Sequence, residues 1–225
     1  MLSFIKKNPY VLWVLYIPAY FATFIALEKR TNVDFHIIHS VLDDKIPFCE
    51  FFIIPYYMWF AFVFITVGIL ILKDKKEFNL MAWHLALGMT VFLLVSWLYP
   101  NKLELRPDTF PRENIFTNIV RFLYSQDTDT NVLPSIHVYN SLSVTIGMLR
   151  CKVSKDRIWV KVIYVVLTTL IIMSTVFLKQ HSVIDVITAI FMGVIFYTAV
   201  YVIAPAIQSR SVKEEQAILQ ESESA

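Results

Sequence analysis

Cysteine, clusters of basic residues and charge in general are all scarce in this sequence. Only Cys49 and Cys151 occur among 225 residues, so a disulfide framework is not expected. No block of lysines and arginines forms the footprint that nucleic-acid binding needs, and we do not expect DNA or RNA as a partner. Charged residues make up 17% of the chain and hydrophobic residues 57%. This balance excludes an ordinary water-soluble domain.

Six long apolar runs dominate what the sequence does contain. Each has about 20 residues, long enough for a helix to cross a hydrocarbon core of about 30 Å. The runs predict membrane spans at residues 9–27, 51–72, 80–99, 134–150, 158–178 and 183–206. We therefore predict an all-α fold, a six-transmembrane-helix bundle formed by residues 1–208. A polar cytoplasmic tail follows at residues 209–225, frayed or helical in water.

Polar residues qualify two of the predicted spans. Lys6 and Lys7 precede the first run as they would in a secretory signal, but the sequence has no convincing small-residue cleavage site and favours a retained span. The fourth run contains Ser135, His137 and Asn140. Lipid cannot satisfy such groups, so this face must turn toward the bundle or a wet cavity.

The distribution of lysine and arginine predicts the orientation in the membrane. Basic residues are dense in the short loops 73–78 and 150–157, whereas the long loops 28–50 and 100–133 hold more acidic than basic residues. The positive-inside rule then predicts that both termini are cytoplasmic. We expect the protein to lie in the plasma membrane. Loop 28–50 is either an amphipathic cap or a solvated loop. Nothing in the sequence indicates an oligomeric state.

Three polar clusters lie at the ends of these spans. They are Arg106-Pro107, Pro134-Ser135-Ile136-His137 and Lys179-Gln180-His181-Ser182-Val183-Ile184-Asp185. The predicted topology brings all three to the outer side of the bilayer. Two histidines, a carboxylate, a hydroxyl and a guanidinium at one membrane depth are typical of phosphoryl-transfer chemistry, with a membrane lipid as the substrate.

His181 and Asp185 are four residues apart at the start of the sixth span, so a helix places them on one face. The carboxylate can accept a hydrogen bond from one imidazole nitrogen and leave the other as a nucleophile. A purely structural histidine–aspartate pair is the alternative interpretation. The free N–H groups at the start of this span are also expected to point toward a bound phosphate.

The other two clusters supply acid–base and phosphate-binding candidates. His137 can protonate a leaving oxygen and then take a proton from water, because a pKa near neutrality suits both steps. Ser135 offers a hydroxyl at a helix start, and Arg106 offers a planar guanidinium that matches two phosphate oxygens. A polar helix cap and an anchor at the membrane edge are the alternative roles. Lower-ranked cations in the same loop are Lys102, Arg112 and Arg121.

The remaining histidines give no sign of a metal site. His36 and His39 are three residues apart in the first outer loop, but no matching cysteines or carboxylates accompany them. His84 is alone in the third span, where a hydrogen-bonded interior imidazole is the expected role. We predict neither a metal nor any other cofactor.

The ordered motifs resemble those of the type-2 phosphatidic acid phosphatase superfamily, a six-helix membrane group that shares its site with soluble vanadium haloperoxidases. Its motifs are KxxxxxxRP, PSGH and SRxxxxxHxxxD. The matching residues are Arg106 and Pro107 in the first motif, Pro134, Ser135 and His137 in the second, and Ser174, His181 and Asp185 in the third. The resemblance covers about residues 99–185, and the predicted spans extend it over most of the chain.

The resemblance implies a role for each of the central residues. It implies a phosphohistidine intermediate on His181, orientation of His181 by Asp185, acid–base work by His137, and phosphate contacts from Arg106 and Ser135. It also implies that no metal is required.

Three positions depart from the family motifs. Tyr99 stands where the first motif has lysine, Ile136 where the second has glycine, and Thr175 where the third has arginine. Two cations that would stabilise the charge on the transferring phosphoryl group are therefore absent. We predict Lys179 as a replacement cation, with Lys102 as the second candidate.

Three functions from different classes fit this pattern. We expect an integral membrane lipid phosphatase that hydrolyses phosphatidate, phosphatidylglycerophosphate or a prenyl diphosphate, because the two histidines and the aspartate can already use water. The alternative is a lipid phosphotransferase that moves a head group from a phosphodiester lipid to another alcohol. The absent cations favour it, since a diester carries about one negative charge and a monoester nearly two. A scaffold or transporter that binds lipid head groups is the third possibility.

Overall fold

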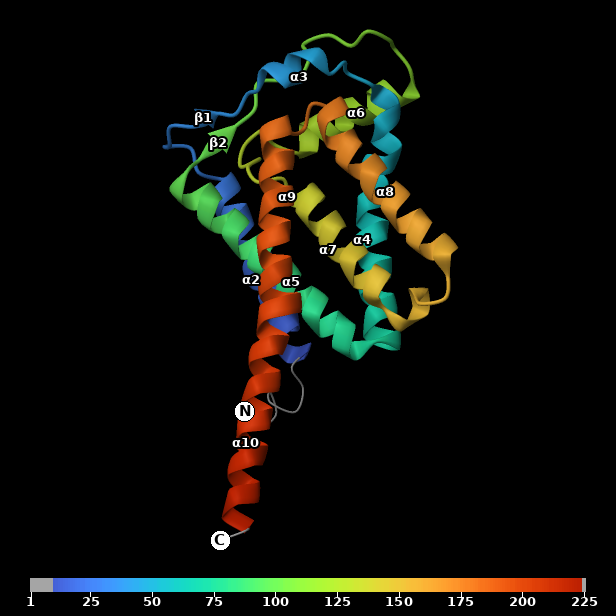
Figure 1. The fold of residues 1–225 in the computed structure, drawn as a ribbon. Coiled ribbons are helices and arrows are strands. Elements are labelled where there is room, and N and C mark those ends of the chain that lie inside the picture. Colours follow the sequence, from blue (N-terminus) through green and yellow to red (C-terminus); the bar gives the residue numbers. More distant parts are fainter. Residues whose placement is uncertain (1–9, 224–225) are drawn as a thin grey trace.

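A computed structural model describes residues 10–223, and the described chain is almost entirely helical. Its elements in chain order are α2 (Tyr10–Glu28), β1 (His36–Ile37), α3 (Val41–Lys45), η1 (Glu50–Phe52), α4 (Ile53–Lys73), α5 (Lys75–Leu98), β2 (Asn101–Lys102), α6 (Ile115–Gln126), α7 (Ile136–Arg150), η2 (Lys152–Ser154), α8 (Ile158–Phe177), α9 (Val183–Tyr197), η3 (Thr198–Ile203) and α10 (Ala204–Glu223). Figure 1 shows the long helices side by side, with the short elements β1, β2, α3 and α6 gathered over one end. The all-α fold predicted from the apolar runs is confirmed.

Four of the helices are long and apolar enough to cross a membrane. They are Glu50–Lys73, Lys75–Leu98, Ile158–Phe177 and Val183–Ser211. Large apolar side chains on their outer faces have no protein neighbours to cover them, and Phe64 and Leu72 of α4 are 80% and 78% exposed. An apolar outer surface of this extent suits lipid and not water. The chain is therefore a membrane-embedded protein.

The first and fourth predicted spans form helices, but within the described residues neither is among those long and apolar enough to cross a membrane. The apolar part of α2 runs over Leu15–Glu28, and α7 has 15 residues. A count of six spans therefore stays a prediction. α7 lies in the middle of the bundle, packed against α4, α5, α8 and α9. Its buried Asn140, Ser141 and Ser143 confirm that the polar face of this helix turns inward.

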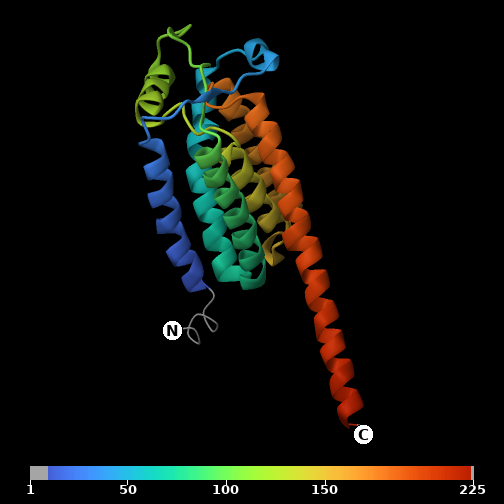
Figure 2. The ribbon, with the colours of Figure 1, turned by 90° about the vertical axis from the view of Figure 1, so that its left-hand side faces the viewer.

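The last helix continues well beyond the bundle. α9, the π-helical segment η3 and α10 follow one another without a break, and Figure 2 shows α10 extending past the other helices at the end opposite the short elements. The segment predicted to be frayed or helical is thus helical as far as Glu223.

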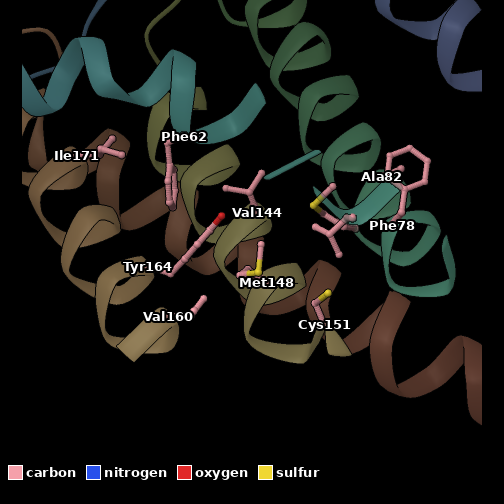
Figure 3. Close-up of a cluster of buried hydrophobic side chains, with 11 residues drawn as sticks. Phe62, Phe78, Ala82, Val144, Met148, Cys151, Val160, Tyr164 and Ile171 are labelled. Carbon is pink, nitrogen blue, oxygen red and sulfur yellow. The ribbon is translucent and has the colours of Figure 1, made fainter. Parts of the chain in front are cut away.

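An apolar core ties the helices together at the end away from the short elements. Figure 3 shows its side chains, among them Phe62 of α4, Ala82 of α5, Val144 and Met148 of α7, and Tyr164 of α8. Burial of such side chains is the main source of stability where protein packs on protein. This core fixes α7 between its neighbours and so sets the position of the other end of α7, where His137 lies.

His84 has the structural role that the sequence suggests for it. Its Nδ1 lies 2.8 Å from Ser143 Oγ and its Nε2 lies 3.1 Å from the Gly193 carbonyl oxygen. Both ring nitrogens of this buried imidazole therefore have partners, as buried polar groups require. The contacts join α5, α7 and α9 deep in the bundle.

The loops 28–50 and 100–133 are bound to one another over one end of the bundle. β1 and β2 pair in parallel, with His36 opposite Asn101 and Ile37 opposite Lys102. The Asn101 side-chain oxygen accepts the N–H groups of Val132 and Leu133 at 2.8 and 2.9 Å. The small sheet therefore holds the segment that leads into α7.

Candidate active site

The structure brings the three polar clusters together beneath the covering loops. Arg106 Nη2 donates to Gln180 Oε1 at 2.7 Å, which joins the first cluster to the third. The Ser135 backbone N–H donates to the Asp185 carbonyl oxygen at 3.2 Å, which joins the second to the third. Stretches of chain that are far apart in sequence thus form one polar centre.

His181 is held by the helix that begins directly after it. Ser182 is the N-cap of α9, and the Asp185 side chain completes a capping box by accepting the Ser182 N–H at 2.9 Å. The same Asp185 Oδ2 lies 3.3 Å from His181 Nδ1. Asp185 thereby fixes a proton on Nδ1, and His181 Nε2, which has no hydrogen-bond partner among residues 10–223, is the basic nitrogen.

His137 faces His181 from the first turn of α7. The two ring centroids are 5.7 Å apart at an angle of 61°, close enough for one phosphoryl group to contact both rings. Tyr56 and Trp59 of α4 pack on the other side of His137, with centroid distances of 4.8 and 4.4 Å. His137 Nδ1 is buried and has no partner within the described part of the chain. An unpartnered buried nitrogen beside a nucleophile indicates a place for a ligand.

A large apolar cavity opens onto both histidines. It measures about 790 Å³ and is walled by α2, α4 and α5. Its lining runs from Ile71 and Phe78, at the far end of the bundle, to His137 and His181. Because the lining is apolar except near the histidines, the cavity combines a site for a hydrocarbon chain with a polar end.

Arg106 directs its guanidinium at the protein itself. Nη1 donates to the carbonyl oxygens of Tyr124 and Asp127 at 3.3 and 3.0 Å. Nη2 donates to the Thr128 carbonyl oxygen at 2.7 Å, in addition to Gln180 Oε1. These bonds use every N–H of the two terminal nitrogens. The arginine therefore anchors residues 124–128 against the loop that carries His181, and a direct phosphate contact stays a prediction.

The carboxylate of Asp43, in α3, binds at the start of α9. The sequence predicts that the N–H groups there are free to bind phosphate. Asp43 Oδ1 accepts the Val183 N–H at 2.8 Å, and its Oδ2 accepts the Ser182 hydroxyl at 2.6 Å. A buried carboxylate at this position is stabilised by the positive end of the helix dipole. The end of α9 is thus already capped by a protein anion, and the expected phosphate contact with these N–H groups has no support here.

The side chain of Lys179 also bonds to the covering segment that contains α3. Its Nζ donates to the carbonyl oxygens of Asp43 and Ile46 at 2.7 and 2.5 Å. Burial lowers the pKa of the Lys179 amine, and the nearby carboxylates of Asp43 and Asp44 oppose that shift. Lys102 pairs with Glu104 at 2.5 Å. The cavity lining contains neither lysine, and their phosphate contacts stay predictions that require these bonds to break.

The lower-ranked cations of the outer loop form ion pairs, Arg112 with the buried Glu50 and Arg121 with the exposed Glu113. Arg112 Nε lies 2.8 Å from Glu50 Oε1, and Arg121 Nη2 lies 2.5 Å from Glu113 Oε1. Both ion pairs are structural contacts, and neither includes His137 or His181. Within residues 10–223, no three histidine, cysteine, aspartate or glutamate side chains gather as metal ligands.

Residues 80–209 match the family model of the PAP2 superfamily. The chain belongs to the PAP2 superfamily. The matched region runs from α5 to α10 and includes His137, His181 and Asp185. Membership indicates a phosphatase-type enzyme, and the apolar helices place it in a membrane. No curated protein and no solved structure matches the chain.

The positions that depart from the PAP2 motifs are filled by residues that do not replace the absent cations. Tyr99 stacks on His36 with ring centroids 4.1 Å apart and is exposed. Thr175 is buried, and its hydroxyl donates to the Ile172 carbonyl oxygen of its own helix at 2.8 Å. Ile136 lines the cavity. The centre of this PAP2 protein is therefore poorer in positive charge than the family motifs prescribe.

Several side chains of the candidate active site belong to no motif that can be recognised in the sequence. Gln180 adjoins His181, yet an isolated glutamine signals no function. Asp43 is 139 residues from its partner Ser182, and neither Tyr56 nor Asp127 follows a recognisable spacing to a histidine. Only the folded chain shows that these side chains surround His181 and His137.

We expect Asp43→Asn to lower kcat of this PAP2 protein about tenfold while KM stays within about twofold, and to lower the unfolding temperature. Losing the charge-assisted bonds to the start of α9 costs about 1–3 kcal/mol and loosens the segment that holds His181. The measurement is steady-state turnover together with thermal unfolding in micelles.

Asp44→Asn is the matched control for that experiment. Asp44 neighbours Asp43 but is exposed and pairs only with His39, at 2.9 Å, among the described residues. Its substitution leaves both readouts unchanged. A variant at Asp43 with normal kcat shows that the cap does not position His181.

Proposed function

We propose that this membrane protein hydrolyses a phosphate ester of a lipid through a phosphohistidine formed on His181. The observation that carries the proposal is the pair of His181 and Asp185 facing His137 at the polar end of an apolar cavity. A nucleophile, its orienting carboxylate and a second imidazole are the groups that such a double displacement needs.

In the first step, His181 Nε2 attacks phosphorus and the bond from phosphorus to the leaving alcohol breaks. Protonated His137 gives its proton to the departing oxygen, so the alcohol leaves neutral. Asp185 stabilises the positive charge that develops on His181 as the N–P bond forms. In the second step, water gives a proton to His137 and attacks phosphorus, and the N–P bond breaks. Phosphate is released and both histidines return to their starting states.

The cavity supports a lipid as the substrate. Phe78 and Phe92 of α5 both line it, and they are 14 positions apart, which corresponds to about 21 Å of helix. This exceeds the roughly 15 Å of one leaflet of a hydrocarbon core. Because α2 packs mainly against α5, a lipid tail can reach the cavity between α2 and α4. The tail then lies along α5 while the phosphate meets the histidines.

We place the site at the outer face of the membrane. The connections from α4 to α5 and from α7 to α8 contain or adjoin the dense basic residues, and both lie at the end opposite the short elements (Figure 1). His137 and His181 lie at the starts of α7 and α9. The positive-inside rule makes that end cytoplasmic. The active site then faces outward and draws its substrate from the outer leaflet.

A phosphotransferase is the second candidate. It differs only in the second step, where the hydroxyl of another molecule takes the place of water. The observation that favours it is the engagement of Arg106, Lys179 and Lys102 with protein acceptors, which leaves few of their N–H donors for a dianionic monoester.

The purified protein is tested in micelles with phosphatidate, phosphatidylglycerophosphate, a prenyl diphosphate and a phosphodiester lipid. The hydrolase is supported if any of these lipids is cleaved to inorganic phosphate or a phosphate-bearing product. An acid-labile phosphohistidine on the protein must accompany that cleavage. A new phospholipid in the presence of an added alcohol, without free phosphate, selects the transferase. Lipid binding without either product contradicts both enzymes.

A further inference from the structure

Several buried polar atoms at the polar end of the cavity have no hydrogen-bond partner. They belong to residues that line the cavity beside His181 and His137. Within the described residues these atoms are Gln180 Nε2, Asn131 Oδ1, Asn140 Oδ1, His137 Nδ1 and Trp59 Nε1. Because an unsatisfied buried polar atom is destabilising, a group of them in one cavity indicates a ligand that satisfies them.

Gln180 presents a hydrogen-bond donor with no charge. Its side chain is on a residue only 4% exposed, and its Oε1 accepts from Arg106 at 2.7 Å. A guanidinium can only donate, so this bond fixes which end of the amide is oxygen. The NH₂ group must then be the end without a partner, on a residue that lines the cavity and directly precedes the nucleophile. It is placed to donate to a phosphoryl oxygen.

Asn131 presents an acceptor to the same space. Its Nδ2 donates to Glu28 at 2.5 Å, and a carboxylate can only accept, so its buried Oδ1 is the free end. Asn131 is 4% exposed. A ligand that satisfies this oxygen must donate a hydrogen bond, which a phosphoryl oxygen cannot do.

Asp127 adds a carboxylate to the acceptor side. It lines the cavity, and its Oδ2 accepts the Tyr56 hydroxyl at 3.3 Å. Burial raises the pKa of this carboxyl, while the positive charge of Arg106 and the hydrogen bond from Tyr56 oppose that shift. In the described part of the chain, no lysine or arginine lines the cavity. The ligand at this end therefore meets an anionic group, and the nearby Arg106 already bonds to protein oxygens through its terminal N–H groups.

These donors and acceptors define a ligand with two parts. Gln180 and the histidines suit a phosphoryl group of low charge, and Asp127 and Asn131 suit a neighbouring group that carries O–H or N–H. A monoester dianion fits poorly, because the Asp127 carboxylate repels it and the terminal N–H groups of Arg106 already have protein acceptors. A diester carries about one negative charge and can bear a head group beside its phosphate.

We infer that the substrate is a lipid phosphodiester whose head group donates hydrogen bonds, with Gln180 Nε2 bound to a phosphoryl oxygen and Asp127 with Asn131 bound to the head group. Hydroxyl groups and a primary ammonium share this chemistry. The inference rests on the proposed function and narrows its substrate to one charge class. The reaction itself is unchanged, because His181 Nε2 displaces one alcohol from phosphorus and water or another alcohol then displaces His181.

The first experiment compares kcat/KM of the wild-type protein for four lipids, each the sole substrate in mixed micelles. Phosphatidylglycerol carries hydroxyls, phosphatidylethanolamine carries an N–H cation, phosphatidylcholine carries a cation without N–H, and phosphatidate is a monoester. We expect one of the first two to exceed both phosphatidylcholine and phosphatidate by at least about tenfold. The better of the two identifies the donor as hydroxyl or ammonium. Phosphatidate as good as the diesters overturns the inference.

Two variants separate the parts of the subsite. Asp127→Asn keeps the size of the side chain but removes its charge, and we expect it to reduce the preference over phosphatidate by about tenfold. Gln180→Glu keeps the acceptor for Arg106 but loses the donor, and we expect kcat/KM for every phosphoester to fall about a hundredfold with no loss in unfolding temperature. A purely structural role would leave the ratio between substrates unchanged, and that result contradicts the assignment of Asp127.

Asp108→Asn is the control, because Asp108 is exposed in the same outer loop and its substitution leaves the substrate ratio unchanged. His181→Gln separates a failure of the diester inference from a failure of the proposed function. A wild-type protein that cleaves phosphatidate best, with all activity lost in His181→Gln, keeps the proposed function and overturns the diester. No cleavage of any of the four lipids overturns the inference, and no cleavage of phosphatidylglycerophosphate and a prenyl diphosphate as well overturns the proposed function.

Discussion

His181→Gln is expected to reduce phosphoester turnover by at least about 10⁴-fold, because the substitution removes the nitrogen that attacks phosphorus. Glutamine retains a side chain that can hydrogen-bond to Asp185, so the start of α9 keeps its capping box. The loss should appear in kcat with every lipid, and no phosphohistidine should form. Product release and acid-labile labelling of the protein measure the two effects.

His39→Gln is the matched control for this prediction. His39 is an exposed histidine of the first outer loop that pairs with Asp44, and the same substitution there leaves turnover unchanged. If His181→Gln retains more than about one hundredth of the wild-type kcat, His181 is not the nucleophile, and the structural interpretation of the pair with Asp185 becomes the better one.

The broad architecture follows from the sequence because it depends on local patterns. Apolar runs about as long as a bilayer is thick predict helices whatever their neighbours are, and the observed α4, α5, α8 and α9 begin or end within a few residues of the predicted spans. The spacing of His181 and Asp185 also has a local meaning, since four residues make about one helical turn. An even number of crossings between clusters then brings them to the same side.

The partners of the charged groups could not be predicted, because they depend on contacts between distant segments. The charge of Lys179 predicts a phosphate ligand. In the fold, however, its amine lies 2.7 Å from the carbonyl oxygen of Asp43, 136 residues away. Arg106 likewise turns to backbone carbonyls and Gln180. Carbonyl oxygens are present at every residue and give no signal in a sequence. Which cation is left for a substrate is therefore decided by the tertiary fold.

The same limit applies to the cavity. α2 and α4 are both apolar, and their sequences do not reveal that α2 packs mainly on α5 and leaves space beside α4. Glu28 contributes to this arrangement by accepting hydrogen bonds from Asn131 and Thr128, which attaches the end of α2 to the segment before α7. These contacts join residues about 100 positions apart, so no periodicity within either segment predicts them.

His137→Gln is expected to lower turnover of a lipid substrate by about 10²–10⁴-fold, the range typical of a lost general acid and base. The leaving alcohol must then depart without a proton, and water must attack without a base. Because His181 and Asp185 remain, the variant still possesses its nucleophile. The two steps can therefore be separated by the choice of leaving group.

A nitrophenyl phosphoester makes that separation, because nitrophenolate leaves readily without protonation. With this substrate His137→Gln should release nitrophenolate in a burst equivalent to about one turnover and then stop, since the second step still needs the base. Denaturation in alkali should recover the phosphohistidine, whose N–P bond survives there and breaks in acid. His181→Gln should give neither burst nor label. A His137 variant that is equally slow with both substrates and shows no burst means that His137 does not protonate the leaving group, and its packing against Tyr56 and Trp59 is then structural.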